Sequence, residues 1–441
     1  MYFSDRGGIE CGNDFPLGGL DQGNSLHSAF SNCGYSFKGA GCRLVAAFPR
    51  TCFANFLPPL LFESGWNLRW ENFQRYFLPF GLYAVFGVLI SIVGIGGALY
   101  GFDVLPLGVA LLVAVALAAT DPISVIALFK ELGVGRQIST VLEGESLLND
   151  GVAVVAFSLL LDLAMGVQSI ADFSLSQAAI DFLRFTTIGV AVGCAMGFAI
   201  SVITQRFDIP LIEQSLTLVS AYGSYLVAEE LGGSGVISTV ALALILGNYG
   251  SRIGMNPHTR SVVTEFWELL AFVITSIVFL LIGDQTNLGI FIDYFPPILI
   301  AIGALLLSRL IGVILLSNLS NLFQTEKITW QEMVVLWWGG LRGAVAIALA
   351  LSFPTQLPDR ELAAAIVYGV VIFTLLVQGL TVKPLINLLK LVGTSDPTTE
   401  NNNIDEWIDF LKKEAQNRAL DQQKYLEIIA SLEEQRNRNY E

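Results

Sequence analysis

Long apolar segments dominate this chain, and each has about the length that a helix needs to cross a lipid bilayer. A spanning helix takes roughly 20 mainly apolar residues. Ten segments reach or approach this length: 78–100, 104–129, 137–162, 183–204, 211–228, 234–249, 261–283, 290–316, 331–352 and 361–390. Because hydrophobic residues make up 54% of the chain and charged residues only 14%, we predict an all-α polytopic membrane protein.

Polar stretches flank this membrane domain, which we place at residues 53–392. Residues 1–52 are rich in Gly, Ser and Asn and contain no spanning run, so we expect a disordered stretch outside the membrane. Residues 53–63 have the composition of the second half of a spanning segment that ends at Glu63. Residues 393–441 carry apolar side chains at helical spacing and predict a cytoplasmic helical tail, either a regulatory or dimer-docking helix or a solvated one.

Basic residues in the short loops predict the orientation of the chain. They fall on every second connection, at Arg69 and Arg75, Lys130 and Arg136, Arg206, Arg252 and Arg260, and Lys327. The alternate connections carry mostly acids. By the positive-inside rule the basic connections and the C-terminus are expected in the cytoplasm.

Five of the charged residues in the apolar segments stand out, because a charge at mid-bilayer costs roughly 3 kcal/mol. They are Asp121, Glu145, Asp150, Arg309 and Arg342. Both histidines, in contrast, fall outside the apolar segments. Proton transfer within the membrane would therefore depend on carboxylates.

A proline next to one of these acids predicts a broken helix. Pro122 lacks an N–H and disfavours helical geometry at the residue before it, so the segment 104–129 should unwind at Thr120 and Asp121. Broken spans expose backbone groups that coordinate ions near the middle of the membrane. The alternative is a simple kink with an acid that reaches water.

The sequence ESLLND at 145–150 concentrates oxygen atoms on one side of a helix. With an advance of about 100° per residue, Glu145, Ser146, Asn149 and Asp150 fall within an arc of about 140°. Small hard cations prefer oxygen ligands, so Asp150, Ser146, Asp121 and Thr120 are a candidate Na⁺ site. Burial disfavours the charged carboxylate, which lets Asp150 hold either a cation or a proton. A polar patch without a ligand is the alternative.

The two buried arginines need partners. We expect Arg309 to form a structural ion pair with Glu145. Arg342 lies among Gly339, Gly340 and Gly343, which predict a second break; a cation there offsets the negative ends of half-helices, and Glu63 is a candidate partner. Three further acids are expected at the membrane interface, with a cation-attracting funnel as the alternative: Glu143, Glu265 and Glu268.

Five motifs, taken together, resemble those of a known family. FLPPLLFE, ALAATDP, GESLLNDG, SRLIGV and GGLRGAV occur in the order and approximate spacing of the monovalent cation/proton antiporters of the bacterial NhaP and animal sodium/proton exchanger type, over residues 53–390. The resemblance implies thirteen helices in two inverted repeats, with the segments 104–129 and 331–352 as the unwound, crossed pair. The first two helices and half of the third are expected to be missing here.

The resemblance also implies roles for the site residues. Asp150 would be the carboxylate shared by cation and proton, with Asp121, Thr120, Ser146 and Glu145 around it. Asn149 is the family's mark of electroneutral exchange. A homodimer is expected, in which a core domain moves against a dimer-forming domain.

We therefore expect a secondary active antiporter of the plasma membrane, not an enzyme and without a cofactor, that exchanges Na⁺ for H⁺ in pH and salt homeostasis. Li⁺ or K⁺ are alternative ions. A transport-inactive truncated antiporter, a cation channel and an organic-anion transporter are alternative functions, the last disfavoured by the acidic cluster. The sequence leaves open the preference for Na⁺ or K⁺, the pH profile and the direction of flux.

Overall fold

The computed structural model describes residues 49–167, 174–206, 209–285, 291, 293–324 and 326–392, with a few single residues beyond 400. Every regular element in these ranges is a helix, as the composition predicted. The first described helix includes Pro49, four residues before the predicted start of the membrane domain at residue 53. The rest of the expected disordered stretch, and nearly all of the expected tail at 393–441, lie outside the described residues.

The first helices run from residue 49 to residue 164. They are α2 (Pro49–Asn67), α3 (Trp70–Leu82), the π-helical turn η1 (Tyr83–Gly87), α4 (Val88–Gly101), α5 (Leu107–Ala116), α6 (Ile123–Leu132) and α7 (Arg136–Ala164). The expected end of α2 at Glu63 is wrong, since the helix continues to Asn67, whose amide donates to Glu63 Oε1 at 2.8 Å.

The middle of the chain forms α8 (Leu175–Thr204), α9 (Pro210–Glu230), α10 (Gly235–Ile245), η2 (Leu246–Gly250), α11 (Ser251–Gly254) and α12 (Pro257–Gln285). The last part forms α14 (Phe295–Asn321), α15 (Trp330–Trp338), α16 (Ala344–Leu351), α17 (Arg360–Phe373), η3 (Thr374–Gln378) and α18 (Gly379–Leu388).

Seven uninterrupted helices in the described ranges are long and apolar enough to cross a membrane. Three of the ten predicted segments are not among them. Two are interrupted, as predicted, between α5 and α6 and between α15 and α16. The third is α9, which is 21 residues long but carries Glu213, Glu229 and Glu230. The short segment 234–249 becomes a full 20-residue helix, because α10, η2 and α11 continue one another to Gly254.

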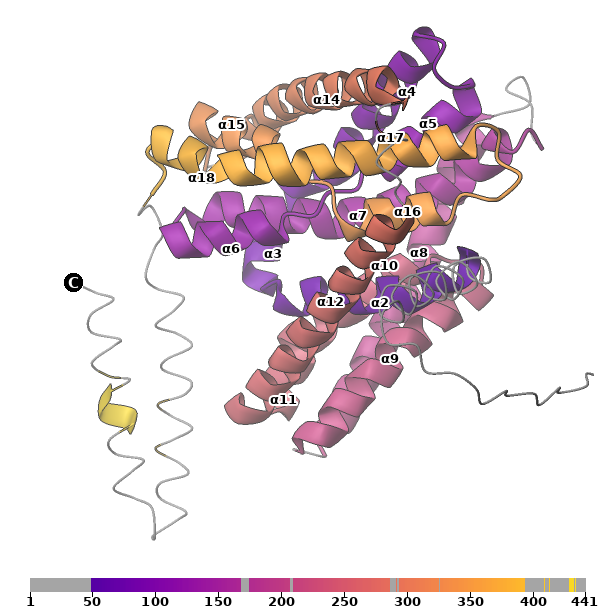
Figure 1. Cartoon of the computed structure of the whole chain (residues 1–441). Helices are drawn as coiled ribbons and strands as arrows, with labels where there is room; N and C mark the ends of the chain where they lie inside the picture. Colours follow the sequence, from indigo (N-terminus) through magenta and orange to yellow (C-terminus); the bar gives the residue numbers. More distant parts are fainter. Residues whose placement is uncertain are drawn as a thin grey trace, which may run out of the picture. The chain divides into compact units, whose positions relative to one another are not determined.

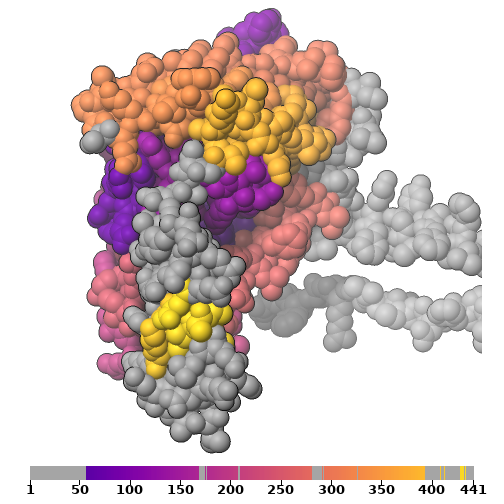
Figure 2. All heavy atoms as spheres, turned by 90° about the vertical axis from the view of Figure 1, so that its left-hand side faces the viewer, coloured from indigo at the N-terminus to yellow at the C-terminus, as the bar shows by residue number. Residues whose placement is uncertain are grey.

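The helices, whose order along the chain can be followed in Figure 1, pack so that the two interrupted segments are in hydrogen-bonding contact. α5 packs against α4, α7, α16 and α17, and α14 packs against α4 and α17. A second group joins α2 to α9, α10 and α12. The space-filling view shows the orange helices of the last part lying directly on the indigo and purple helices of the first part (Figure 2). Residues more than 200 positions apart in the sequence are therefore neighbours.

Candidate functional site

The first interruption separates α5 from α6 at residues 117–122. α5 ends at Ala116, and Pro122 precedes the first residue of α6. Thr120 is buried in this interruption, and the Asp121 backbone N–H donates to the carbonyl of Leu341 at 2.8 Å. The predicted break at Thr120 and Asp121 is present. Because Leu341 lies between α15 and α16, this hydrogen bond joins the first break to the second.

The second interruption lies at residues 339–343, between α15 and α16. Arg342 is 1% exposed, and its Nη1 donates to the carbonyls of Ala118 at 2.7 Å and Ala119 at 3.1 Å. Its backbone N–H donates to Thr374 Oγ1 at 3.2 Å. The carbonyls at a helix C-terminus lack helical partners and carry partial negative charge. A guanidinium from one break therefore caps the carbonyls freed by the other.

This arrangement corrects one expected pair. Arg342 does not pair with Glu63, because its donors face the carbonyls of the first break. Glu63 lies on α2, where its carboxylate accepts from Asn67 at 2.8 Å and from Ser64 at 3.4 Å.

α7 passes beside the first break and contributes two polar side chains to it. Ser146 Oγ donates to the Thr120 carbonyl at 2.5 Å. Asn149 Nδ2 donates to Thr120 Oγ1 at 2.6 Å, and Asn149 Oδ1 accepts from the Thr120 N–H at 3.4 Å. These bonds hold the unwound backbone of Thr120 against α7.

Asp150 lies one residue further along α7 and is 8% exposed. Among the described residues its Oδ1 has no hydrogen-bond partner. Buried polar atoms in proteins are nearly always satisfied, and leaving one unsatisfied costs free energy. An unsatisfied carboxylate oxygen that lines a cavity is a suitable ligand for a cation or proton.

That cavity has a volume of about 390 Å³ and is strongly acidic. Asp150, Asp121, Thr120 and Ser146, which the sequence grouped as a Na⁺ site, all line it. Its titratable lining consists of five carboxylates and a single amine: Glu63, Asp121, Glu143, Asp150, Glu268 and Lys130. A cavity lined by one sign of charge raises the local concentration of the opposite ion.

Of the three acids expected at the membrane interface, two line the acidic cavity and one does not. Glu143 and Glu268 line the cavity together with Glu63, which the sequence had placed in an ion pair. Glu265 does not line it; its side chain is exposed to the surroundings and accepts from Ser261 at 3.2 Å. The funnel alternative therefore fits Glu143 and Glu268, but not Glu265.

Glu145 and Asn149 were expected around the bound ion, and the structure places neither in the lining of the cavity. Glu145 is 1% exposed and accepts from both terminal nitrogens of Arg309, with Nη2 to Oε2 at 3.1 Å. Arg309 Nη2 also donates to the Leu336 carbonyl at 3.1 Å. The expected Arg309–Glu145 pair is thus present, and it connects α7, α14 and α15.

Comparison with known proteins agrees with this geometry. Residues 32–388 match the family model described as sodium/hydrogen exchanger, transmembrane. The chain belongs to the sodium/hydrogen exchanger family. The match begins earlier than the range 53–390 expected from the motifs.

Two similar curated relatives are named Na⁺/H⁺ antiporters. The chain is 57% identical over 351 residues to the Na⁺/H⁺ antiporter ApNhaP of Aphanothece halophytica, covering 80% of this chain and 67% of the relative. It is 52% identical over 355 residues to the low-affinity Na⁺/H⁺ antiporter NhaS1 of Synechocystis, again covering 80% of this chain and 67% of the relative.

Among solved structures, the exchanger fold matches the sodium proton antiporter MjNhaP1 from Methanocaldococcus jannaschii at pH 8. The TM-score is 0.62 at 22% identity, covering 76% of this chain and 84% of the other. At this identity the likeness shows the fold alone.

Two positions in this exchanger have roles that the sequence did not predict. Gly343 was interpreted only as a helix-weakening residue, yet a Cβ at Gly343 would overlap the carboxylate of Asp121. Thr374 accepts from the Arg342 N–H, but a threonine inside an apolar segment carries no signal of such a contact. The run of three glycines around Arg342 was the available sign of a close approach.

Proposed function

We propose that this chain is a secondary active antiporter that exchanges Na⁺ for H⁺ across the membrane, and that Asp150 carries both ions in turn. The cation ligands we assign are Asp150 and Asp121, the hydroxyl of Ser146, and Thr120. Its membership of the sodium/hydrogen exchanger family and its close relatives named Na⁺/H⁺ antiporters support this function.

One observation carries the proposal: Asp150, whose Oδ1 has no hydrogen-bond partner among the described residues, lines the same cavity as Asp121, Thr120 and Ser146. Asp121 contributes a second carboxylate, which accepts the Ile123 N–H at 3.2 Å and is also hydrogen-bonded to the backbone of Ala344. Oxygen ligands suit a small hard cation. The first break supplies Thr120 and Asp121, and α7 supplies Ser146 and Asp150. Arg342 and Ser146 donate to the carbonyls of Ala118, Ala119 and Thr120, which lack helical partners at this break.

Exchange follows from competition for one carboxylate. Asp150 bound to Na⁺ and Asp150 bound to H⁺ have the same net charge, so a site that alternates between them moves one positive charge in each direction. Asn149, the neighbour on α7, is neutral and uses its amide on Thr120. We therefore propose electroneutral, one-for-one exchange.

The acidic lining supports delivery of the cation to this carboxylate. Glu63, Glu143 and Glu268 border the same cavity as Asp150. Their charge attracts cations and repels anions, which argues against an organic anion as substrate. The comparisons give no support to a transport-inactive chain.

The protein is a multi-pass membrane protein, with seven uninterrupted apolar helices in the described ranges. We further propose that it lies in the plasma membrane with the C-terminus on the cytoplasmic side, as the alternation of basic and acidic connections indicates. A homodimer is proposed from the family alone.

The test is reconstitution of the full chain into liposomes with a pH gradient and an internal pH dye. Addition of Na⁺ should change the internal pH, also when an ionophore clamps the membrane potential. Asp150→Asn should abolish this change, because the amide of asparagine neither binds nor releases a proton near neutral pH.

The matched control is Asp162→Asn, an exposed acid near the end of α7 that does not line the cavity. It should exchange like the wild type. Retained Na⁺-driven proton movement in Asp150→Asn would refute the shared carboxylate. A Na⁺ current without any proton movement in the wild type would instead identify a channel.

A further inference from the structure

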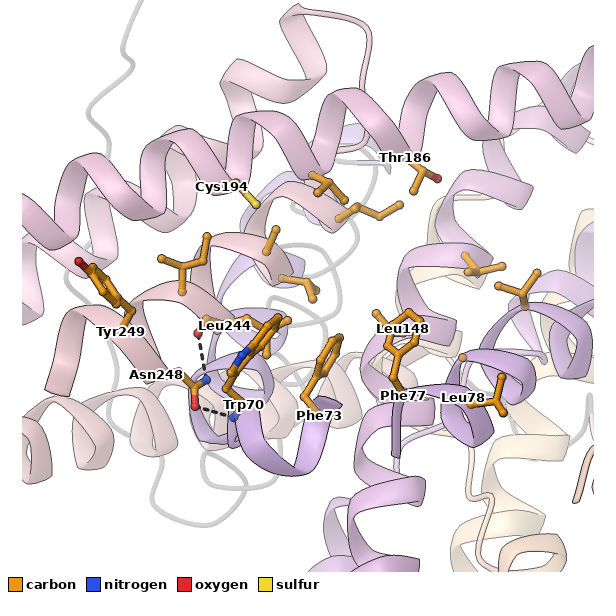
Figure 3. Close-up of a pocket in the computed structure, with 18 of the residues that line it drawn as sticks. Trp70, Phe73, Phe77, Leu78, Leu148, Thr186, Cys194, Leu244, Asn248 and Tyr249 are labelled. Carbon is orange, nitrogen blue, oxygen red and sulfur yellow. Dashed lines mark hydrogen bonds between the residues drawn. The ribbon is translucent and has the colours of Figure 1, made fainter. Parts of the chain in front are cut away.

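A second and larger cavity lies against α7, lined by different residues of that helix from those that line the acidic one. It has a volume of about 1010 Å³, and α7 contributes Leu148 and Val152 to it. The remaining walls come from α3, η1, α8, α10, η2 and α11, with aromatic side chains of α3 lying opposite α8 (Figure 3). The lining is almost entirely apolar, so water gains few hydrogen bonds there.

The apolar cavity is long enough to hold an acyl chain of one bilayer leaflet. It follows α8 from Phe182 through Cys194 to Phe198, which corresponds to about 24 Å at 1.5 Å per residue. The hydrocarbon core of a bilayer is about 30 Å thick, so one leaflet measures about 15 Å. The cavity is open at its side, since Phe77 is 52% and Phe198 51% exposed. A chain of one leaflet can therefore enter laterally.

One end of the cavity is polar and carries a net positive charge. There the Trp70 N–H donates to Asn248 Oδ1 at 2.7 Å, and Asn248 Nδ2 donates to the Leu244 carbonyl at 2.9 Å (Figure 3). Arg252 lines the cavity beside Glu71 and pairs with it at 3.6 Å. Arg69 pairs with the same carboxylate at 3.8 Å. Two guanidiniums thus share one acid.

We propose that this cavity binds one acyl chain of an anionic phospholipid, with the phosphate at the Arg252 and Arg69 end. The apolar wall supplies contact for the chain over one leaflet, and the excess guanidinium charge complements the headgroup. The same arginines lie on connections that carry the basic residues of the chain, which assigns the lipid to the cytoplasmic leaflet. Binding of this lipid does not depend on ion exchange at Asp150.

The experiment uses the full chain in phosphatidylcholine nanodiscs that contain a trace of phospholipid with a photoreactive diazirine on its acyl chain. The headgroup of the probe is either phosphatidylglycerol or phosphatidylcholine, and adducts are mapped by mass spectrometry. Phosphatidylglycerol should label the cavity-lining stretch of α8 several-fold more than phosphatidylcholine does. Leu307 on α14, which is 60% exposed, should be labelled equally by both probes.

Two substitutions test the site, one at its basic end and one in its apolar wall. Arg252→Gln should lower the preference for the anionic probe by about fivefold, the effect of about 1 kcal/mol per basic residue. Val190→Trp should reduce labelling of the cavity by occupying it, since Val190 lines the cavity and is 42% exposed.

The control for the second variant is Val202→Trp, the same change on the same helix at a residue that is 57% exposed and outside the cavity. It should leave labelling of the cavity unchanged. Equal labelling of the cavity by both probes would overturn the proposal. Labelling that Val190→Trp leaves intact would overturn it as well, because both results describe ordinary contact with bulk lipid.

Discussion

The tightest approach in the ion site is between Gly343 and the carboxylate of Asp121. A Cβ at Gly343 would lie 2.6 Å from Asp121 Cγ, and Gly343 has φ −137° and ψ −144°. Alanine can adopt a negative φ, so the constraint is mainly the space beside the carboxylate. Glycine at this position lets the second break reach the acid of the first.

We therefore expect Gly343→Ala to displace Asp121 and weaken cation binding. Overpacking costs about 1–3 kcal/mol, which corresponds to a loss of roughly tenfold to a hundredfold in apparent Na⁺ affinity. The measurement is the Na⁺ dependence of dye-reported exchange in liposomes. Gly303→Ala on α14 is the control, because an added Cβ there meets nothing within 4 Å. Unchanged affinity in Gly343→Ala would show that Asp121 does not contact the ion.

At the scale of the elements, the two interrupted helices stabilise each other. The carbonyls of Ala118 and Ala119, at the end of one half-helix, are capped by Arg342 from the other segment. The Asp121 N–H in turn donates to the Leu341 carbonyl. Neither break is satisfied by its own segment alone, so each needs the other to persist within the membrane.

Arg342→Met should therefore loosen the first break without unfolding the rest. A hydrogen bond to a charged group contributes about 1.5–3 kcal/mol, so protection from amide hydrogen exchange in residues 117–122 should fall by roughly tenfold to a hundredfold. Hydrogen exchange followed by mass spectrometry measures this, with peptides of α14 as the internal reference. Unaltered protection at 117–122 would mean that water or lipid caps these carbonyls equally well.

At the scale of the whole molecule, one buried ion pair connects helices from both ends of the chain. Arg309 and Glu145 have side chains 9% and 1% exposed, and they are 164 positions apart in the sequence. Lys383 and Glu131 form a second long-range pair at 2.8 Å, but their side chains are 51% and 62% exposed. Only the first pair is removed from solvent screening.

Removing one partner should affect stability very differently in the two pairs. Arg309→Met leaves Glu145 buried and unpaired, and we expect a loss of about 3–5 kcal/mol in the free energy of unfolding. Lys383→Met should cost no more than about 1 kcal/mol. Thermal unfolding in detergent compares them, and Glu145→Gln added to Arg309→Met should restore part of the loss. Equal melting temperatures for Arg309→Met and Lys383→Met would contradict the structural role of the buried pair.

The helices and both interruptions could be predicted because their causes are local. Apolar segments of about 20 residues impose spanning helices, while Pro122 and the glycines around Arg342 disfavour helical geometry within their own segments. Local chemistry also placed Thr120 and Asp121 at the first break. The end of α2 could not be read this way, because Asn67 extends the helix by bonding to Glu63.

The roles of the polar residues depended on neighbours distant in sequence. Glu145, Ser146, Asn149 and Asp150 share one arc of α7, which suggested that all four face the ion. Glu145 instead pairs with Arg309 on α14. Asn149 donates its amide to Thr120 at the first break. Helical geometry by itself determines the direction of these side chains, but their partners come from other helices. The sequence therefore determined where charge enters the membrane and where helices break, and only the tertiary structure decided that Asp150 keeps an oxygen without a hydrogen-bond partner, because the side chains that bind its neighbours come from other helices.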